Sequence, residues 1–221
     1  MNEDKWFVVV PSNLPLLKCE LGKEAMIHLW DCIREGEKNK QNVNPQLAGN
    51  IRESFNITDI DGKFFKNHLE RYALDYIHGN HANMWRNNFH PFSCKKLTLG
   101  QLWVNYQYQN DFNPLHDHGG VLSFVVWMKI PTKSEEQHSI PICANSNTPC
   151  ASSFQFLYTN ILGETCRGYF NMDPEVEGTM LLFPSTILHQ VYPFFNTGEK
   201  RISISGNIFY DVNQLAEILE K

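Results

Sequence analysis

The order of apolar and polar residues divides the chain into a helical first part and a β-rich second part. Apolar residues recur every three to four positions over residues 22–37 and again over residues 64–77, which predicts two amphipathic helices. Over residues 97–108 apolar and polar side chains alternate instead, and β-favouring residues are common, which predicts a strand with one buried face. The chain therefore changes from helical to β structure near residue 95.

Further short strands are predicted downstream, and most are bounded by turn-forming residues. A short helix is also expected at residues 47–55, and a long surface loop at residues 132–153. A run of short strands of this kind is typical of a β-barrel or a sandwich. The predicted strands lie at residues 121–130, 154–158, 179–183, 189–194 and 201–210, and a last helix lies at residues 213–221.

We expect a single domain over residues 1–221, because no linker-like stretch separates the two parts. A chain of 221 residues is long enough to bury a core without disulfides. In this arrangement residues 1–95 are a mostly helical part that packs on the barrel. Residues 96–210 form the barrel core, and residues 211–221 form a C-terminal helix.

Composition narrows the classes of function. The formal net charge of -5 argues against a nucleic-acid-binding face, which needs clustered positive charge. The six cysteines include no CxxC pair, so we expect reduced thiols and no zinc knuckle. The first residues lack the basic flank and apolar core of a signal peptide, and no apolar run is long enough to span a bilayer. We therefore expect a cytoplasmic protein without a membrane partner.

The candidate chemistry begins with two histidines, His116 and His118, just before a Gly-Gly turn. Residues two apart in extended backbone point to the same side, so both imidazoles face one point while Asp117 faces away. Neutral imidazole is the commonest protein ligand of mid-row transition metals. His189 is a candidate third ligand, far downstream. Asp117 replaces His118 as a ligand if the loop bends away from strand geometry.

Arg201 begins a predicted strand twelve residues after His189, and it is a candidate binding residue in addition to the histidines. A guanidinium presents a planar fork that binds a carboxylate through two hydrogen bonds. Ser203 lies on the same face of the strand and adds a hydroxyl donor. Taken alone, Arg201 would be interpreted as a surface residue after a turn. Together with the histidines, it indicates a metal site with a carboxylate-bearing cosubstrate.

The remaining histidines that we considered are expected to have structural roles. His28 lies inside the first predicted helix, and His138 lies in the predicted loop 132–153. His78, His81 and His90 fall at a helix end and in the loop after it, and no carboxylate or cysteine completes a metal set around them.

Several separated motifs resemble the core of a 2-oxoglutarate/Fe(II) dioxygenase. They occur in the expected order and cover about residues 97–210. The chain is most similar to a branch of oxygenases common in phage genomes and marine bacteria, in which the metal motif is His-x-His in place of His-x-Asp. A phage-encoded protein of this kind would work in the host cytoplasm. The motifs are residues 103–106 (WVNY), 112–118 (FNPLHDH), 122–123 (LS), 178–184 (GTMLLFP), 189–191 (HQV) and 201–207 (RISISGN).

The resemblance implies a fold that is mainly β with α: a double-stranded β-helix, or jelly roll, preceded and flanked by helices. It also implies Fe(II), 2-oxoglutarate and O2 as cofactor and cosubstrates, and hydroxylation of a small molecule or a protein side chain with release of succinate and CO2. No catalytic side chain is expected beyond the metal centre. The residues implied are His116, His118 and His189 as metal ligands, and Arg201 and Ser203 for 2-oxoglutarate. Three residues on neighbouring strands are candidates either for further cosubstrate contacts or for packing inside the barrel: Asn105, Tyr106 and Ser123.

Two other interpretations stay open at this point. The first is a three-histidine, cupin-like metalloenzyme that does not use 2-oxoglutarate, although it leaves Arg201 and Ser203 without an assigned partner. The second is a non-catalytic jelly-roll module with a binding or structural role.

Overall fold

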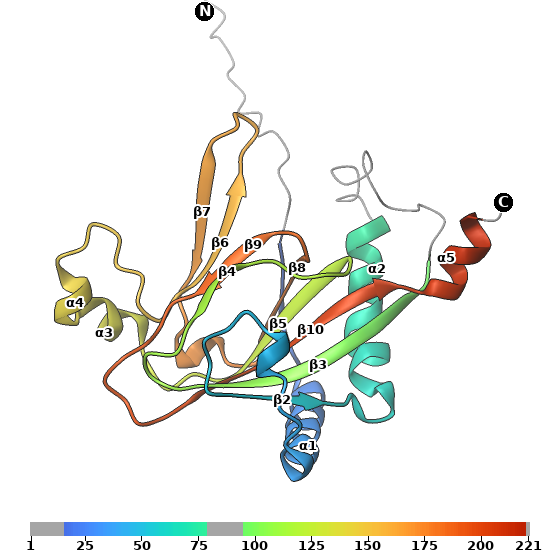
Figure 1. The fold of residues 1–221 in the computed structure, drawn as a ribbon, viewed down its shortest axis with the longest axis horizontal. Coiled ribbons are helices and arrows are strands. Elements are labelled where there is room, and N and C mark those ends of the chain that lie inside the picture. The colour runs from blue at the N-terminus through green and yellow to red at the C-terminus, as the bar shows by residue number, and fades with distance from the viewer. Residues whose placement is uncertain (1–15, 79–94, 220–221) are drawn as a thin grey trace, which may run out of the picture.

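The computed structural model describes residues 16–78 and 95–219, and the strands within them form two antiparallel sheets (Figure 1). The larger sheet has the strand order β1-β8-β5-β10-β3-β2, and the smaller has the order β4-β9-β6-β7. The strands are β1 (Leu17–Glu20), β2 (Glu53–Ile57), β3 (Leu97–Gln107), β4 (Asn113–His116), β5 (Leu122–Lys129), β6 (Phe154–Thr159), β7 (Thr165–Phe170), β8 (Thr179–Pro184), β9 (Leu188–Val191) and β10 (Arg201–Tyr210).

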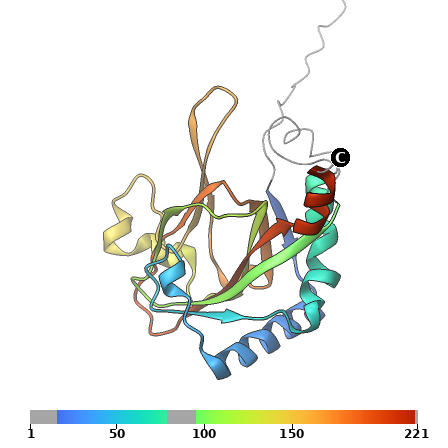
Figure 2. The same ribbon diagram turned by 45° about the vertical axis from the view of Figure 1, so that its right-hand side comes forward.

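The helices lie outside the two sheets. Helix α1 (Lys23–Asn39) and helix α2 (Glu70–His78) cover one face of the larger sheet, as Figure 2 shows. A π-helical segment, Phe65–Leu69, leads directly into α2. The remaining helices are α3 (Ser134–Ser139), α4 (Pro141–Ala144) and α5 (Val212–Leu219), and 3-10 turns lie at Asn44–Gln46, Ile60–Gly62 and Pro174–Val176.

Side-chain alternation in the larger sheet separates two hydrophobic clusters. In β5, Phe124 and Val126 join the cluster under α1 and α2, whereas Val125 and Trp127 face the smaller sheet. There Trp127 packs edge-on against Phe154 of β6, with ring centroids 5.9 Å apart. The larger sheet therefore has an inner face, which packs against the smaller sheet and not against the helices. The predicted class, mainly β with α, is confirmed.

Three predictions about local structure need correction. Residues 47–55 do not form a helix; β2 begins at Glu53 and pairs with β3, a partner that local periodicity does not reveal. Residues 132–153 are not a plain surface loop, because they contain α3 and α4 and end in the buried pair Ser152 and Ser153. The N-terminal part is helical as predicted, but it also supplies both edge strands of the larger sheet, β1 and β2.

Two further expectations concern the surroundings of the protein. The cysteines at positions 19, 32, 143, 150 and 166 are free thiols, while Cys94 lies outside the described residues. Within residues 16–78 and 95–219, no helix is both long enough and apolar enough to cross a membrane.

Candidate metal and cosubstrate site

Three imidazole rings meet at one end of the inner face. The ring centroids of His116 and His189 are 4.3 Å apart, and the ring of His118 lies 4.9 Å from each of them. Their candidate ligand atoms all lie within 4.8 Å of one another. This arrangement is compact enough for one metal ion to contact all three rings.

Strand pairing explains how residues so far apart in sequence meet. His116 at the end of β4 lies directly opposite His189 of β9 in the antiparallel register. His118 follows in the loop, where its backbone N–H donates to the carbonyl of Ser185 at 2.8 Å. Gly120 completes the turn with φ of 99°, and a Cβ there would lie 2.8 Å from the carbonyl oxygen of Ile208. Only glycine fits this position without strain.

Backbone carbonyls orient two of the three rings. Nδ1 of His116 lies 2.7 Å from the carbonyl oxygen of Pro114, and Nδ1 of His189 lies 3.0 Å from that of Ile187. A carbonyl can only accept, so each Nδ1 carries the proton and donates. Nε2 of both rings is then the unprotonated nitrogen, which is the form that a metal binds.

Burial keeps all three imidazoles neutral. Loss of solvation lowers the pKa of His116, lowers that of His118 to about 4 and lowers that of His189 to about 3. Phe154 stacks on the His189 ring at 5.5 Å, and Phe183 contacts the same ring edge-on at 5.0 Å. The triad is therefore a set of neutral donors at neutral pH, with an apolar wall behind it.

Asp117 does not join this group. Its side chain is exposed, as the alternation of strand residues predicts, and the compact set of ligand atoms contains His118 instead.

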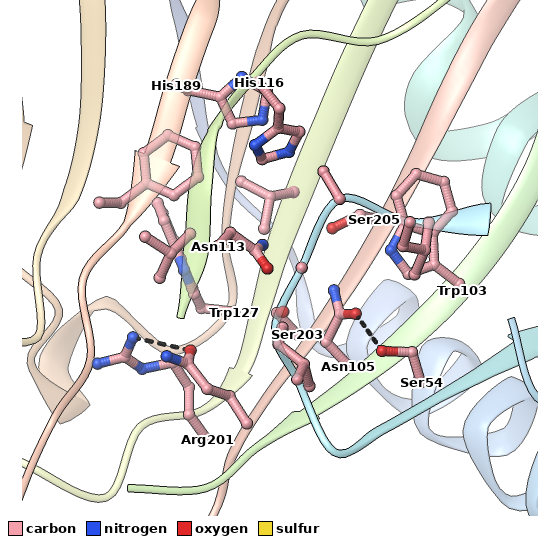
Figure 3. A pocket seen from close by; sticks show the side chains of 18 of the residues that line it. Ser54, Trp103, Asn105, Asn113, His116, Trp127, His189, Arg201, Ser203 and Ser205 are labelled. Atoms are coloured by element: carbon pink, nitrogen blue, oxygen red, sulfur yellow. Dashed lines mark hydrogen bonds between the residues drawn. The ribbon is translucent and has the colours of Figure 1, made fainter. Parts of the chain in front are cut away.

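Arg201 lies deeper in the same cavity (Figure 3). It is only 2% exposed, and loss of solvation lowers its pKa to about 9. Within the described part of the chain, no carboxylate forms an ion pair with it, and its Nε has no hydrogen-bond partner. A buried cation without a counter-ion is unfavourable, so this site is suited to an anionic ligand.

Neutral groups hold the guanidinium in place. Nη1 donates to Oε1 of Gln107 at 3.2 Å, and Nη2 donates to the carbonyl oxygen of Ser152 at 3.1 Å and to its hydroxyl. The guanidinium carbon lies 4.9 Å from the ring centroid of Phe194.

The other candidate cosubstrate residues lie on both faces of the larger sheet. Ser203 and Asn105 line the cavity, and Asn105 accepts a hydrogen bond from Ser54 at 2.8 Å. Ser123 lies on the same face, but its hydroxyl donates to Asn207 at 2.7 Å and it does not line the cavity. Tyr106 points to the opposite face.

The interpretation of Tyr106 as a cosubstrate contact is therefore corrected. Its hydroxyl donates to Glu37 of α1, and its ring belongs to the cluster under the helices. Burial and the carboxylate of Glu37 both raise the pKa of Tyr106. The reason is the alternation of β3, because Asn105 and Tyr106 are neighbours and cannot both face the cavity.

Sequence reasoning missed Gln107, Asn113 and Ser152. Gln107 could have been found, since it lies two residues beyond Asn105 on the same face of β3. Asn113 lies between the histidines and Arg201 in Figure 3, and its buried Oδ1 has no hydrogen-bond partner among the described residues. Nothing in the local sequence pointed to Ser152.

The other histidines that the structure describes do not line this cavity. Nε2 of His28 lies 2.8 Å from Oδ1 of Asp59 and 3.5 Å from Sγ of Cys32. The Asp59 carboxylate also accepts the backbone N–H groups of Phe64 and Phe65, so it caps the helical segment that starts there. This second cluster is explained by capping, since its polar groups satisfy one another. His81 and His90 lie outside the described residues.

Comparison with known families and structures adds to this geometry. Residues 101–207 match a family model described as "Putative 2OG-Fe(II) oxygenase". No curated protein is similar enough in sequence to count as a match.

Solved structures share the fold at low sequence identity. The crystal structure of a Pseudomonas putida prolyl-4-hydroxylase has 13% identity and a TM-score of 0.51, over 89% of this chain and 92% of that one. Two enzymes of nogalamycin biosynthesis are also similar: the non-heme alpha ketoglutarate dependent epimerase SnoN, with 12% identity over 89% of this chain and 78% of that one, and the carbocyclase SnoK, with 7% identity over 89% and 79%. Both have a TM-score of 0.53. The predicted double-stranded β-helix is confirmed.

Proposed function

We propose that the chain is an oxygenase that uses Fe(II), 2-oxoglutarate and O2, and that it hydroxylates an organic substrate with release of succinate and CO2, because residues 101–207 match the model of the 2OG-Fe(II) oxygenase family. The observation that carries the proposal is the pairing, in one cavity, of three converging neutral imidazoles with a buried arginine that has no ion pair among the described residues.

His116, His118 and His189 would hold the Fe(II). The chemistry of the donors fits this role, because two of the rings are fixed with Nε2 free and all three are neutral at physiological pH. Three protein ligands would leave other coordination positions of the ion for a cosubstrate and O2. Since neutral imidazoles do not offset the charge of a divalent ion, a dianionic cosubstrate is favoured beside it.

Arg201 would bind the distal carboxylate of 2-oxoglutarate, and Ser203 would add a hydroxyl. Nε of Arg201 is buried and has no hydrogen-bond partner within residues 16–78 and 95–219, which supports this role, because an anion would supply both an acceptor and the missing negative charge. Asn105 also lines the cavity and is available beside Ser203. Ser123, whose hydroxyl is already bonded to Asn207, would support the strand instead.

When bound, Fe(II) and 2-oxoglutarate supply the oxidative chemistry, in which one oxygen atom of O2 enters succinate and the other enters the substrate. The chain's own residues orient these groups and exclude water. Phe154 and Phe183 back the His189 ring, and Trp103 approaches His118 edge-on with ring centroids 5.9 Å apart. An apolar wall of this kind limits hydrolysis and proton leakage at the reacting centre.

The substrate would present an uncharged group to the cavity, whether it is a small molecule or a protein side chain. Arg201 is the one Lys, Arg, Asp or Glu side chain among the described residues that line the cavity, and the cosubstrate would occupy it. We also propose that residues 1–221 act as one domain, since the N-terminal part supplies edge strands to the sheet that carries Arg201.

The test is metal binding combined with 2-oxoglutarate consumption. Under anaerobic conditions, Mn(II) should bind the wild-type protein in a 1:1 ratio, and His189→Ala should abolish this binding. With Fe(II), O2, 2-oxoglutarate and ascorbate, the wild type should form succinate slowly in the absence of an added substrate, because ascorbate supplies the two electrons that reduce the second oxygen atom to water. Metal binding without any 2-oxoglutarate binding would instead favour the cupin-like alternative.

A further inference from the structure

We infer that Ser152 is a positioning residue, which orients Arg201 toward the distal carboxylate of 2-oxoglutarate. The inference rests on the proposed function and goes beyond it, because Ser152 lies in the segment between β5 and β6 and does not line the cavity. It would act on the cosubstrate only through Arg201.

Ser152 supplies most of the contacts that hold the guanidinium. Its carbonyl oxygen and its hydroxyl both accept from Nη2 of Arg201, and Gln107 accepts from Nη1. Two of the three acceptors therefore belong to one residue. Because hydrogen bonds to charged groups are stronger than neutral ones, these contacts are well suited to fix the plane of the guanidinium.

The backbone of Ser152 is itself fixed in a conformation that a serine rarely adopts. Its φ is +66°, in the left-handed region that favours glycine. Its N–H donates to the carbonyl of Pro193 at 2.8 Å, and its hydroxyl oxygen lies 3.2 Å from that of Thr132. Glycine would adopt this conformation more easily but would lack the hydroxyl that contacts Arg201. Strain of this kind is typical of functional positions.

Helix α3 makes hydrogen bonds to the backbone beside Phe194, whose ring contacts Arg201. Gln137 donates to the carbonyl of Phe195 at 2.9 Å and accepts the Phe195 N–H at 2.8 Å, next to Phe194, whose ring packs on the guanidinium. Ser134 hydrogen-bonds Asp173 through its hydroxyl at 2.9 Å. Helix α3 therefore fixes the backbone next to Phe194, which is a second contact of the guanidinium.

The contacts leave two N–H donors of Arg201 for the cosubstrate. A guanidinium has five N–H groups, and the protein uses three of them. The buried Nε is without a partner in the described part of the chain, and Arg201 lines the cavity. Loss of the Ser152 hydroxyl would free the arginine to turn, and the N–H groups aimed at the carboxylate would lose their orientation.

The test compares two 2-oxo acids that differ at the distal end. The full-length protein loaded with Mn(II) is titrated calorimetrically with 2-oxoglutarate and, separately, with pyruvate, which has no distal carboxylate. Ser152→Gly removes the hydroxyl without backbone strain, and Ser152→Ala removes it while keeping Cβ. Both should raise the Kd for 2-oxoglutarate roughly tenfold, equivalent to about 1.4 kcal/mol. The Kd for pyruvate should not change.

Ser153→Ala is the matched control. Ser153 is the neighbouring residue, is equally buried, and has a hydroxyl without a hydrogen-bond partner among the described residues, so its loss should leave both Kd values at wild-type levels. An unchanged Kd for 2-oxoglutarate in Ser152→Gly, or an equal rise for both acids, would overturn the positioning role. A wild-type protein that binds 2-oxoglutarate no better than pyruvate would instead count against the proposed function itself.

Discussion

Replacement of Arg201 by methionine should separate cosubstrate binding from stability. Methionine keeps much of the length of the side chain but removes the charge and every N–H donor. The substitution therefore removes the partner that we propose for the distal carboxylate, while the histidines at the other end of the cavity are left in place.

The expected loss of affinity can be worked from the contacts of the guanidinium. Of its five N–H groups, Gln107 and Ser152 occupy three, which leaves two for a carboxylate. A hydrogen bond to a charged group contributes roughly 1.5–3 kcal/mol, so two at the lower end give about 3 kcal/mol. This corresponds to about a hundredfold rise in the Kd for 2-oxoglutarate.

The effect on folding should be much smaller. The substitution removes a 2%-exposed cation that has no ion pair among the described residues, which is favourable, but it also leaves Gln107 and Ser152 without a donor. Because these effects oppose each other, the free energy of unfolding should change by no more than about 2 kcal/mol.

Calorimetric titration of the Mn(II)-loaded protein measures the first quantity, and urea unfolding measures the second. Arg201→Lys keeps the charge but not the planar fork, so its Kd for 2-oxoglutarate should lie between those of the wild type and Arg201→Met. If Arg201→Met binds 2-oxoglutarate as tightly as the wild type, the assignment of Arg201 is refuted.

Five further substitutions test the metal ligands, the packing between the sheets and the turn after His118. In titrations with Mn(II), His118→Ala should lose 1:1 binding, whereas Asp117→Ala should retain it. The opposite result would assign the ligand role to Asp117. Phe154→Ala should lower the free energy of unfolding by about 3–5 kcal/mol, because the Phe154 ring is 3% exposed and packs between the sheets. A loss below about 1 kcal/mol in urea unfolding would contradict that packing. Gly120→Ala should lower the free energy of unfolding by about 1–3 kcal/mol, because the φ of Gly120 is 99° and the carbonyl of Ile208 lies close to the added Cβ. Gly119→Ala should leave the Tm unchanged, because the space around its Cβ is open. Equal Tm values for the two variants would contradict the turn geometry.

The fold and part of the site could be predicted from short-range patterns. Helix α1, the π-helical segment with α2, and strand β3 all lie where periodicity indicated them. The predicted helix over residues 47–55 was wrong because β2 depends on pairing with β3, about fifty residues away in the chain. Periodicity describes one segment at a time and says nothing about its partner.

The two faces of β3 show what the alternation of side chains along a strand can predict. The alternation of residues 97–108 placed Asn105 and Tyr106 on opposite faces, yet both were candidates for cosubstrate contacts. The structure places Asn105 in the cavity and Tyr106 against α1, as the alternation requires. The same rule would have suggested Gln107, which contacts Arg201.

Local sequence patterns were enough to identify the candidate chemistry: two histidines spaced to face one side, a distant third histidine, and an arginine at the start of the last strand. These features depend on side-chain type and on the two-residue period of a strand, and both can be read from neighbouring positions. Which of these groups come into contact depends on the three-dimensional fold. It brings His189 opposite His116, buries Arg201 without an ion pair among the described residues, and places Ser152 against it across 49 residues of chain. Contacts of this kind depend on the pairing of strands and the path of loops, which no local pattern records.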